Sequence, residues 1–331
     1  MARSMVNQGL YLQRETTSGT AITTAMKRYL GIKGAIGWEV EKEYFRGSGY
    51  KADTGENTLT EMGAADLEVI QDYNAMLPLL SGVFGPPVTT ALGIGPPAAY
   101  SHVFSINPKA ADTLVTFTAM WGDPVLALQA LAWAFHGLTF GVQRNELSLS
   151  SNAILRAPLT GVALPTTGVT EVPMVPVRAS NYDVFMDNTW AALGTTKLLN
   201  LYKIEYDYPD KFVPDWVVNS ALPSYSELME ADDLEYGLTA TLGFDPTGVG
   251  LINDSLNGGM KFIRTSCTGP SINGTDDYSL RFDTAAVLNP GTVASGPNAP
   301  SVVVEFEGRM QVDGTSGNLS SVRLVNGLSG L

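Results

Sequence analysis

Two histidines, His102 and His136, are the side chains of this sequence best suited to proton transfer near neutral pH or to zinc binding. A zinc site needs further ligands at characteristic spacing, and neither histidine lies in an HxH or HExxH motif. A serine–histidine–aspartate triad also needs more than an isolated histidine. We therefore predict that both histidines are structural or surface residues.

Carboxylates are densest at Glu230, Asp232 and Asp233 and at the pair Asp276-Asp277. Such clusters can hold calcium or supply the acid and nucleophile of a glycosidase. Neither cluster follows the DxDxDG spacing of a calcium loop, and both are expected in loops, where charged side chains are ordinarily solvated. We predict neither a metal site nor a hydrolytic site here.

The other patterns that could carry chemistry are incomplete as well. No phosphate-binding glycine motif, GxxxxGK[ST] or GxGxxG, stands between a predicted strand and a predicted helix. Cys267 is the only cysteine, so it excludes an internal disulfide framework, and it is expected to be a small core or interface residue. Tyr202, Ile204, Tyr206 and Tyr208 share one face of an alternating segment, which suits a stacking platform for sugars or bases, a sheet core or a subunit contact. We predict no catalytic residue, no metal and no cofactor, and hence a protein that is not an enzyme.

The composition describes a large folded protein with little surface charge. A length of 331 residues is sufficient for two domains, and a hydrophobic content of 44% is sufficient for a real core. Charged residues make up 16%, below the roughly 25% of typical domains, which suggests a surface partly covered by neighbouring subunits. The 33 acidic and 20 basic residues give a net charge of −13, which disfavours nucleic-acid binding because phosphate contacts require cations.

No targeting or membrane segment is predicted. The first residues lack the apolar core of a secretory signal. The most apolar stretch, Leu126–Phe135, is far shorter than the roughly 20 residues of a membrane span. The chain is therefore expected to be made and kept in solution in a cytoplasm.

The elements that must position these residues are mainly strands. Alternation predicts a long β-hairpin over His136–Pro158, broken by the polar residues 144–146, and a second one over Lys197–Val218. In the second hairpin, Lys203, Glu205 and Asp207 face away from the tyrosines. A short strand is predicted within Ala64–Gly85 and another in the stretch that begins at Tyr182, before the second hairpin. Further strands are predicted over Gly34–Phe45, Asp112–Asp123, Leu234–Phe244, Met260–Pro270, Tyr278–Leu288, Ser301–Val312 and Ser320–Leu328.

Two short helices and several loops complete the prediction. The first helix has Asn74 as its N-cap, ends at Gly85 and tolerates Pro78 only within its first turn; its apolar face is Met76, Leu79, Leu80 and Val83. The second helix lies within Asp245–Gly259. Loops are predicted over Arg46–Gly63 and Val88–Tyr100, while Pro124–Phe135 fits either a helix or a strand.

Strands, a short helix and a long hairpin therefore occur twice along the chain, in similar order. The segment Gly161–Ser180, rich in Pro, Thr and Val, is the best candidate for a linker. We predict an N-terminal arm at residues 1–22, a first domain at 23–160, a linker at 161–180 and a second domain at 181–331. The expected fold class is mainly β, with two tandem β-sandwich or β-barrel domains.

Several stretches in this order resemble the major tail tube protein of long-tailed, non-contractile bacteriophages, in its double-domain form. The stretches are QRETTSGTA (Gln13–Ala21), ADLEVIQDYNAMLPLLSGVFG (Ala65–Gly85), DTLVTFTAMWGD, LTFGVQRNELSLSSNAILRAP, YDVFMDNTWAALGTTKLLNLYKIEYDY, LEYGLTATLGF and MKFIRTSCTGP with DYSLRFDTAAVL. Each is short, so the resemblance depends on their order and spacing over nearly the whole chain. The loop at Arg46–Gly63 and the apolar insertion at Val125–Phe135 depart from the family pattern.

The resemblance implies a structural virion protein without enzymatic activity. Two domains per chain imply homotrimeric rings with pseudo-sixfold symmetry, which stack into a hollow tail tube assembled in the host cytoplasm. The implied partners are further copies of the chain, the tape measure protein, the tail terminator and the distal tail proteins, while genomic DNA passes through during ejection without specific binding and no membrane is involved.

Lumen-facing carboxylates would repel the passing DNA, and the candidates are Glu146, Glu205 and Asp207; ordinary exposure on the outside of the tube is the alternative for them. For the whole chain, the alternative is a β-sandwich binding module or another virion component, such as a distal tail, decoration or carbohydrate-binding protein.

Overall fold

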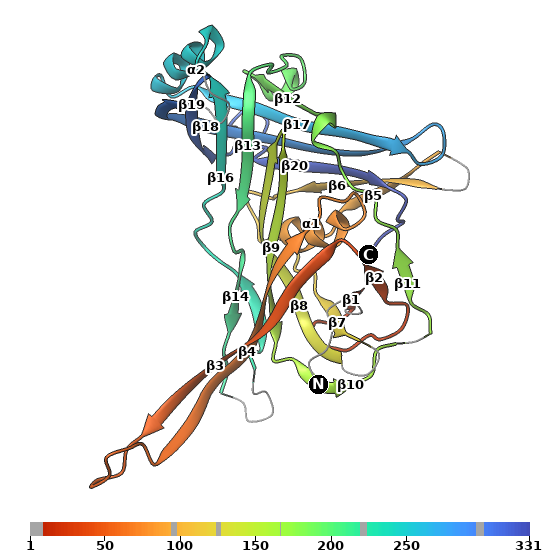
Figure 1. Ribbon diagram of the computed structural model, residues 1–331, viewed down its shortest axis with the longest axis vertical. Coiled ribbons are helices and arrows are strands. Elements are labelled where there is room, and N and C mark those ends of the chain that lie inside the picture. Colours follow the sequence, from red (N-terminus) through yellow and green to blue (C-terminus); the bar gives the residue numbers. More distant parts are fainter. Residues whose placement is uncertain (1–8, 94–97, 124–126, 166, 219–223, 296–300) are drawn as a thin grey trace.

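The structure, a computed structural model, describes residues 9–93, 98–123, 127–165, 167–218, 224–295 and 301–331. The described chain is mainly β, with two short α-helices (Figure 1). Its first half contains β1 (Gly9–Arg14), β2 (Lys27–Tyr29), β3 (Ile32–Phe45), β4 (Gly55–Val69), α1 (Met76–Phe84), β5 (Val88–Leu92), β6 (Ala99–Ser105), β7 (Phe117–Gly122), β8 (Ala127–Gln143), β9 (Glu146–Arg156), β10 (Leu159–Val162) and β11 (Thr170–Val172). Its second half contains β12 (Tyr182–Asp187), β13 (Leu201–Tyr208), β14 (Phe212–Asp215), β15 (Glu227–Glu230), β16 (Gly237–Gly243), α2 (Pro246–Leu256), β17 (Met260–Ser271), β18 (Asp277–Ser295), β19 (Val302–Met310) and β20 (Ser320–Asn326).

Eight antiparallel strands form one continuous ladder in the order β3-β4-β9-β8-β13-β16-β19-β18, called here the eight-stranded sheet. It consists of two sets of four strands. Unit 1 is β3-β4-β9-β8 and unit 2 is β13-β16-β19-β18, and in each unit the helix follows the second strand along the chain. The two units therefore have the same spatial order, and the β8–β13 ladder joins them.

The first halves of β8 and β18 leave this sheet and enter other ladders. The first half of β18 pairs with β17 and β20, extending through β12 on one side and through β6 and β5 on the other. The first half of β8 pairs with β7 and β10, and β7 continues to β1, β2 and the parallel strand β11. Figure 1 shows β17, β18 and β20 running across the molecule above α1.

Helix α1 is buried at every residue and packs on β8 and β6. Its start is held by Asp72, whose carboxylate accepts hydrogen bonds from the backbone N–H groups of Asn74 and Ala75 at 2.9 and 2.8 Å. The sequence predicted Asn74 as the N-cap, and this is wrong by one residue: the N-cap is Ala75, and the helix begins at Met76. Gly82 allows a close approach to β8, because a Cβ atom there would lie 2.6 Å from the Cβ of Phe135.

The long hairpin predicted around residues 144–146 is confirmed as β8–β9, and the predicted helix within Asp245–Gly259 is α2, with Asp245 as its N-cap. The segment 127–135 is strand, while residues 124–126 lie outside the described part. The second predicted hairpin, over Lys197–Val218, is wrong, because its two strands do not pair with each other. β13 pairs with β8 and β16, while β14 pairs with β15 in a separate two-stranded sheet.

Three segments predicted as arm or loop contain strands. Residues 9–14 of the predicted arm form β1, where Leu10 and Leu12 are buried against the core, and residues 1–8 lie outside the described part. The predicted loop 46–63 contains the first half of β4, and the predicted loop 88–100 contains β5 and the start of β6. The predicted linker carries β11 and buries Val172 and Val177.

The β3–β4 hairpin extends far beyond the sheet. Its outer part, residues 37–60, projects from the body of the molecule (Figure 1). The ladder continues to the pair Phe45 and Gly55, where neither strand has core to cover, so these side chains are exposed. The aromatic residues Trp38, Tyr44, Phe45 and Tyr50 of this hairpin are exposed.

Two ladders cross the predicted domain boundary. β8 pairs with β13, and β6 pairs with β20, so strands of both halves share hydrogen bonds. One core cluster also contains residues of both halves, from Leu10 and Phe140 to Phe282 and Leu324. The chain thus buries one shared core between its ladders.

Candidate functional site

The two faces of the eight-stranded sheet differ sharply in chemistry. Side chains of successive strand residues point to opposite faces, and directly paired residues share a face. One row across the sheet runs through seven side chains that are all buried: Ile32, Val69, Leu149, Phe140, Tyr206, Leu238 and Leu288. Val69 and Leu149 lie one position beyond the paired Glu68 and Ser150 along their ladder, and Gly308 pairs with both Leu238 and Leu288. The opposite face is polar and at least partly exposed.

This opposite face, called here the acidic face, is defined by seven carboxylates: Asp66, Glu68, Glu146, Glu205, Asp207, Glu305 and Glu307. On the same strands the cations Lys33, Lys203 and Arg309 lie among them. Most of the other positions are small and polar, such as Thr139, Ser148 and Ser150. The carboxylates outnumber the cations, so this surface repels anions and offers a polyanion little reason to bind.

All three carboxylates predicted from the sequence lie on this face. Glu205 and Asp207 alternate with buried Ile204 and Tyr206 on β13, as predicted. Glu146 joins them because Gln143 pairs with Glu146 across the β8–β9 turn and with Lys203 across the β8–β13 ladder. The sequence could not have brought Glu146 beside β13, since this requires the pairing between units.

Local contacts hold part of the face in place. Lys203 forms an ion pair with Glu205 at 2.8 Å, and Thr139 donates a hydrogen bond to Asp207 at 3.1 Å. Gly141 on β8 pairs with Glu205 on β13 and with Ser148 on β9, and an added Cβ at Gly141 would lie 2.3 Å from the Ser148 hydroxyl. These contacts keep the side chains close to the sheet, so the surface presents charge without long projecting groups.

The two histidines lie on different strands, His102 on β6 and His136 on β8. His102 on β6 is fully buried and bonded to the Thr89 hydroxyl, the Asn326 side chain and the Leu328 carbonyl. Burial lowers its pKa below the ordinary histidine value. His136 lies 3.8 Å from Asp210, and burial lowers its pKa as well. Both therefore favour the neutral form.

The acidic clusters of the sequence do not converge. Glu230 accepts a hydrogen bond from the Asp112 backbone at 2.7 Å, and Asp276 accepts one from Asn273 at 2.8 Å within its own loop. Among the described residues, no three histidine, cysteine, aspartate or glutamate side chains gather at a place that could hold a metal ion.

The tyrosines and the cysteine belong to the core. Tyr206 and Tyr208 are buried, with their hydroxyls bonded to Thr265 at 2.7 Å and Ser320 at 2.9 Å. Tyr206 and Tyr208 therefore offer no stacking platform for sugars or bases, because both rings are covered, whereas Tyr202, at the register shift of β13, is partly exposed. Cys267 is buried beside the Tyr73 hydroxyl at 3.0 Å, and burial raises the pKa of its thiol.

Sequence reasoning missed a buried lysine. Lys211 is 2% exposed, donates to the Val83 carbonyl at the end of α1 at 3.1 Å and forms an ion pair with Asp112. Glu230 lies 3.6 Å from the same ammonium group. No local pattern marks this lysine, because its three partners come from distant parts of the chain.

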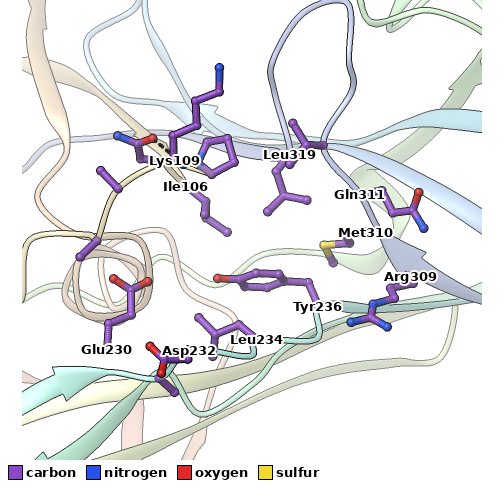
Figure 2. A pocket seen from close by; sticks show the side chains of 16 residues that line it. Ile106, Lys109, Glu230, Asp232, Leu234, Tyr236, Arg309, Met310, Gln311 and Leu319 are labelled. Carbon is purple, nitrogen blue, oxygen red and sulfur yellow. Dashed lines mark hydrogen bonds between the residues drawn. The ribbon is translucent and has the colours of Figure 1, made fainter.

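Beside Glu230 lies a pocket of about 550 Å³ (Figure 2). It is bounded by the loop after β6, by residues 230–236 and by the end of β19. Tyr236 extends into it with its hydroxyl toward the side of Glu230, and Met310, Leu319 and Ile106 form its apolar wall. Lys109 and Arg309 stand at its margins. Burial raises the pKa of Tyr236 above the ordinary tyrosine value, so its hydroxyl stays protonated.

Comparisons with known proteins identify no relative: no protein-family model matches the chain, and a search of curated proteins finds no match. In the described part of the chain, neither helix is long and apolar enough to cross a membrane. The function must therefore be argued from the sheet and its surfaces.

Proposed function

We propose that this protein is a structural subunit that assembles into stacked rings forming a hollow tube, of the kind that conducts DNA in long-tailed bacteriophages. The observation that carries the proposal is the eight-stranded sheet, which joins two units of the same strand order, has one strongly acidic face and, within the described residues, ends in two unpaired edges. In this proposal the protein is located in the virion tail, and its partners are the tape measure, terminator and distal tail proteins.

The unpaired edges support assembly of copies end to end. Within the described residues, β3 has a ladder only with β4, and the second half of β18, from Leu288 to Ser295, only with β19. In unit 1 the matching half of β8 also pairs with β13, the first strand of unit 2. The first strand of another copy, β3, would fill the edge of β18 in the same way. Open edges of this kind promote pairing between chains.

The repetition of units fits a ring. Two tandem units of the same strand order would let three chains provide six equivalent four-stranded segments, which is the basis of a trimer with pseudo-sixfold symmetry. A head-to-tail contact that closes gives a ring, in which no edge stays open. In this proposal the two units take the roles of the tandem tail-tube domains expected from the sequence, and the β8–β13 ladder joins them directly.

The acidic face suits the lumen of such a tube. DNA passing along a wall of carboxylates and small hydroxyl side chains meets like charge and gains no release of counterions from contact. Glu146, Glu205 and Asp207 are placed on this wall in the proposal.

Electron microscopy of the purified protein tests the proposal. Rings of uniform diameter or stacked cylinders are expected, either spontaneously or on raising the protein concentration. Discrete particles of single-chain mass at every concentration, with or without the tail partners, would exclude a tube subunit and favour a binding module.

A further inference from the structure

The hairpin β14–β15 shows how one unit covers another. It connects β13 to β16 within unit 2, yet its buried residues Phe212, Tyr225 and Leu228 pack on unit 1. There they meet the side chains of Ala132, Ala134, Ile154, Met62 and Leu114. The Tyr225 hydroxyl donates to the Ala132 carbonyl at 3.2 Å, and Arg156 donates to the Ser226 carbonyl at 2.7 Å.

The corresponding place on unit 2 is the pocket of Figure 2. Met62 of unit 1 and Tyr236 of unit 2 occupy equivalent positions. Each lies seven residues before the end of the second strand of its unit, which is Val69 in β4 and Gly243 in β16. Met62 pairs with Arg156 at the end of β9, and the Tyr236 carbonyl accepts a hydrogen bond from Met310 at the end of β19. In the described part of the chain no hairpin covers this second place, which is open with Met310, Leu319 and Leu234 in its wall.

The β3–β4 hairpin has no such contact among the described residues. Its outer part connects the first and second strands of unit 1, just as β14–β15 connects the first and second strands of unit 2. Its outer part exposes four aromatic side chains, and Tyr44 is 60% and Phe45 48% exposed. Trp38, Val40, Lys42 and Tyr44 lie on one side of β3, and Glu39, Glu41, Glu43 and Phe45 on the other, so the two strongly exposed aromatic residues at its end point to opposite sides. A monomer gains nothing from exposing these aromatic side chains to solvent.

We propose that the outer β3–β4 hairpin of one copy docks into this pocket of a second copy, with Tyr44 and Phe45 as its anchors. The proposal rests on the proposed assembly, since it names the contact between copies. β3 and β18 form opposite ends of the eight-stranded sheet, so the hairpin and the pocket of neighbouring copies meet when copies join head to tail. Aromatic anchors in an apolar pocket are the usual source of binding energy at interfaces. Charge does not select the occupant, because Glu230 and Asp232 line the pocket together with Lys109 and Arg309, and Arg309 forms an ion pair with Glu235 at 2.8 Å; the aromatic anchors therefore carry the contact.

Crosslinking of mixed chains tests the contact. One chain carries Tyr44→Cys and the other carries Gln311→Cys, an exposed residue that lines the pocket; native Cys267 is buried and does not compete. A short bifunctional maleimide is expected to give at least ten times more mixed product than the control pair of Tyr44→Cys with Ser148→Cys on the acidic face. Equal yields in both pairs would overturn the docking site.

A double variant, Tyr44→Ser with Phe45→Ser, gives an independent readout. Both side chains are exposed, so the thermal unfolding of the monomer should be unchanged while the concentration needed for assembly rises at least tenfold. Leu199→Ser, at an exposed leucine outside hairpin and pocket, is the matched control and should assemble normally. Normal assembly of the double variant would refute the docking but leave the tube intact, whereas crosslinked dimers without any rings would refute the tube alone.

Discussion

At the scale of single residues, the carboxylates of the acidic face are expected to act through charge. Replacing Glu205 and Asp207 with lysine changes the charge of each subunit by four at the centre of the face. We expect the variant to bind duplex DNA at least tenfold more tightly than the parent at about 50 mM salt, and to lose this binding at about 200 mM, because each phosphate contact releases counterions. Filter binding or electrophoretic mobility measures it.

The control for this experiment carries the same change of charge elsewhere. Glu171 and Asp277 are exposed and lie outside the acidic face, so lysine at both positions alters the net charge equally. Equal DNA binding by the two variants would show that net charge matters and the face does not. In assembled particles the Glu205 and Asp207 variant should also release DNA more slowly.

Lys211 tests the buried ion pair. Replacing it with methionine keeps the volume but leaves the carboxylate of Asp112, itself 8% exposed, without its cation. Removing one partner of a buried pair typically costs about 3–5 kcal/mol, so we expect a loss of about that size in the free energy of unfolding. Urea denaturation measures it, and Lys33→Met, at an exposed lysine, should change stability by less than about 0.5 kcal/mol. A loss below about 1 kcal/mol would contradict the buried pair.

Asp187 links stability to pH. Burial raises its pKa, but hydrogen bonds from Thr195, Thr196 and Gly194 outweigh burial and hold the pKa below the ordinary aspartate value. Its contribution to stability is therefore present above the unfolded pKa of about 3.9 and is lost as pH falls through the lower folded value. The difference in unfolding free energy between the parent and Asp187→Asn should be largest near pH 7 and should shrink as the pH falls below about 4. A gap independent of pH in thermal unfolding would contradict this role.

At the scale of elements, the contact between α1 and β8 depends on a missing side chain. Gly82→Ala places a Cβ 2.6 Å from the Cβ and 2.7 Å from the carbonyl oxygen of Phe135. We expect a loss of about 1–3 kcal/mol from overpacking, although alanine favours helix. Gly250→Ala in α2 is the matched control, because its Cβ would meet nothing within 4 Å and should stabilise by up to about 1 kcal/mol. Chemical denaturation distinguishes the two, and a stabilised Gly82→Ala variant would disprove the tight contact.

The elements that sequence reasoning predicted correctly are those whose local pattern agrees with their surroundings. The β8–β9 hairpin alternates because one face is buried, and α2 has an N-cap, Asp245, whose carboxylate accepts hydrogen bonds from Thr247 and Gly248. The first half of β4 was missed, although a short strand was predicted within Ala64–Gly85, because that half lies in solvent, where threonine and glutamate replace the apolar residues that mark a strand. β1 was missed because the polar residues after Arg14 disguise two buried leucines.

At the scale of the whole molecule, the shared ladders predict cooperative unfolding. Strand pairing between β8 and β13 and between β6 and β20 makes each half depend on the other. We expect a single denaturation transition, in which tryptophan fluorescence and far-ultraviolet circular dichroism coincide. Two separate transitions would instead support independent domains at residues 23–160 and 181–331.

The sequence by itself determined the mainly β class, most strand positions and the side of β13 on which Glu205 and Asp207 lie, because alternation along a strand is local. Only the tertiary structure decided that β13 pairs with β8 and β16 and that Glu146 joins the same face. It also decided that Lys211 is buried and that a pocket forms beside Tyr236. Strand pairing and burial depend on contacts between residues far apart in the chain. Many partners satisfy the same short alternating pattern, and the shared core selects among them.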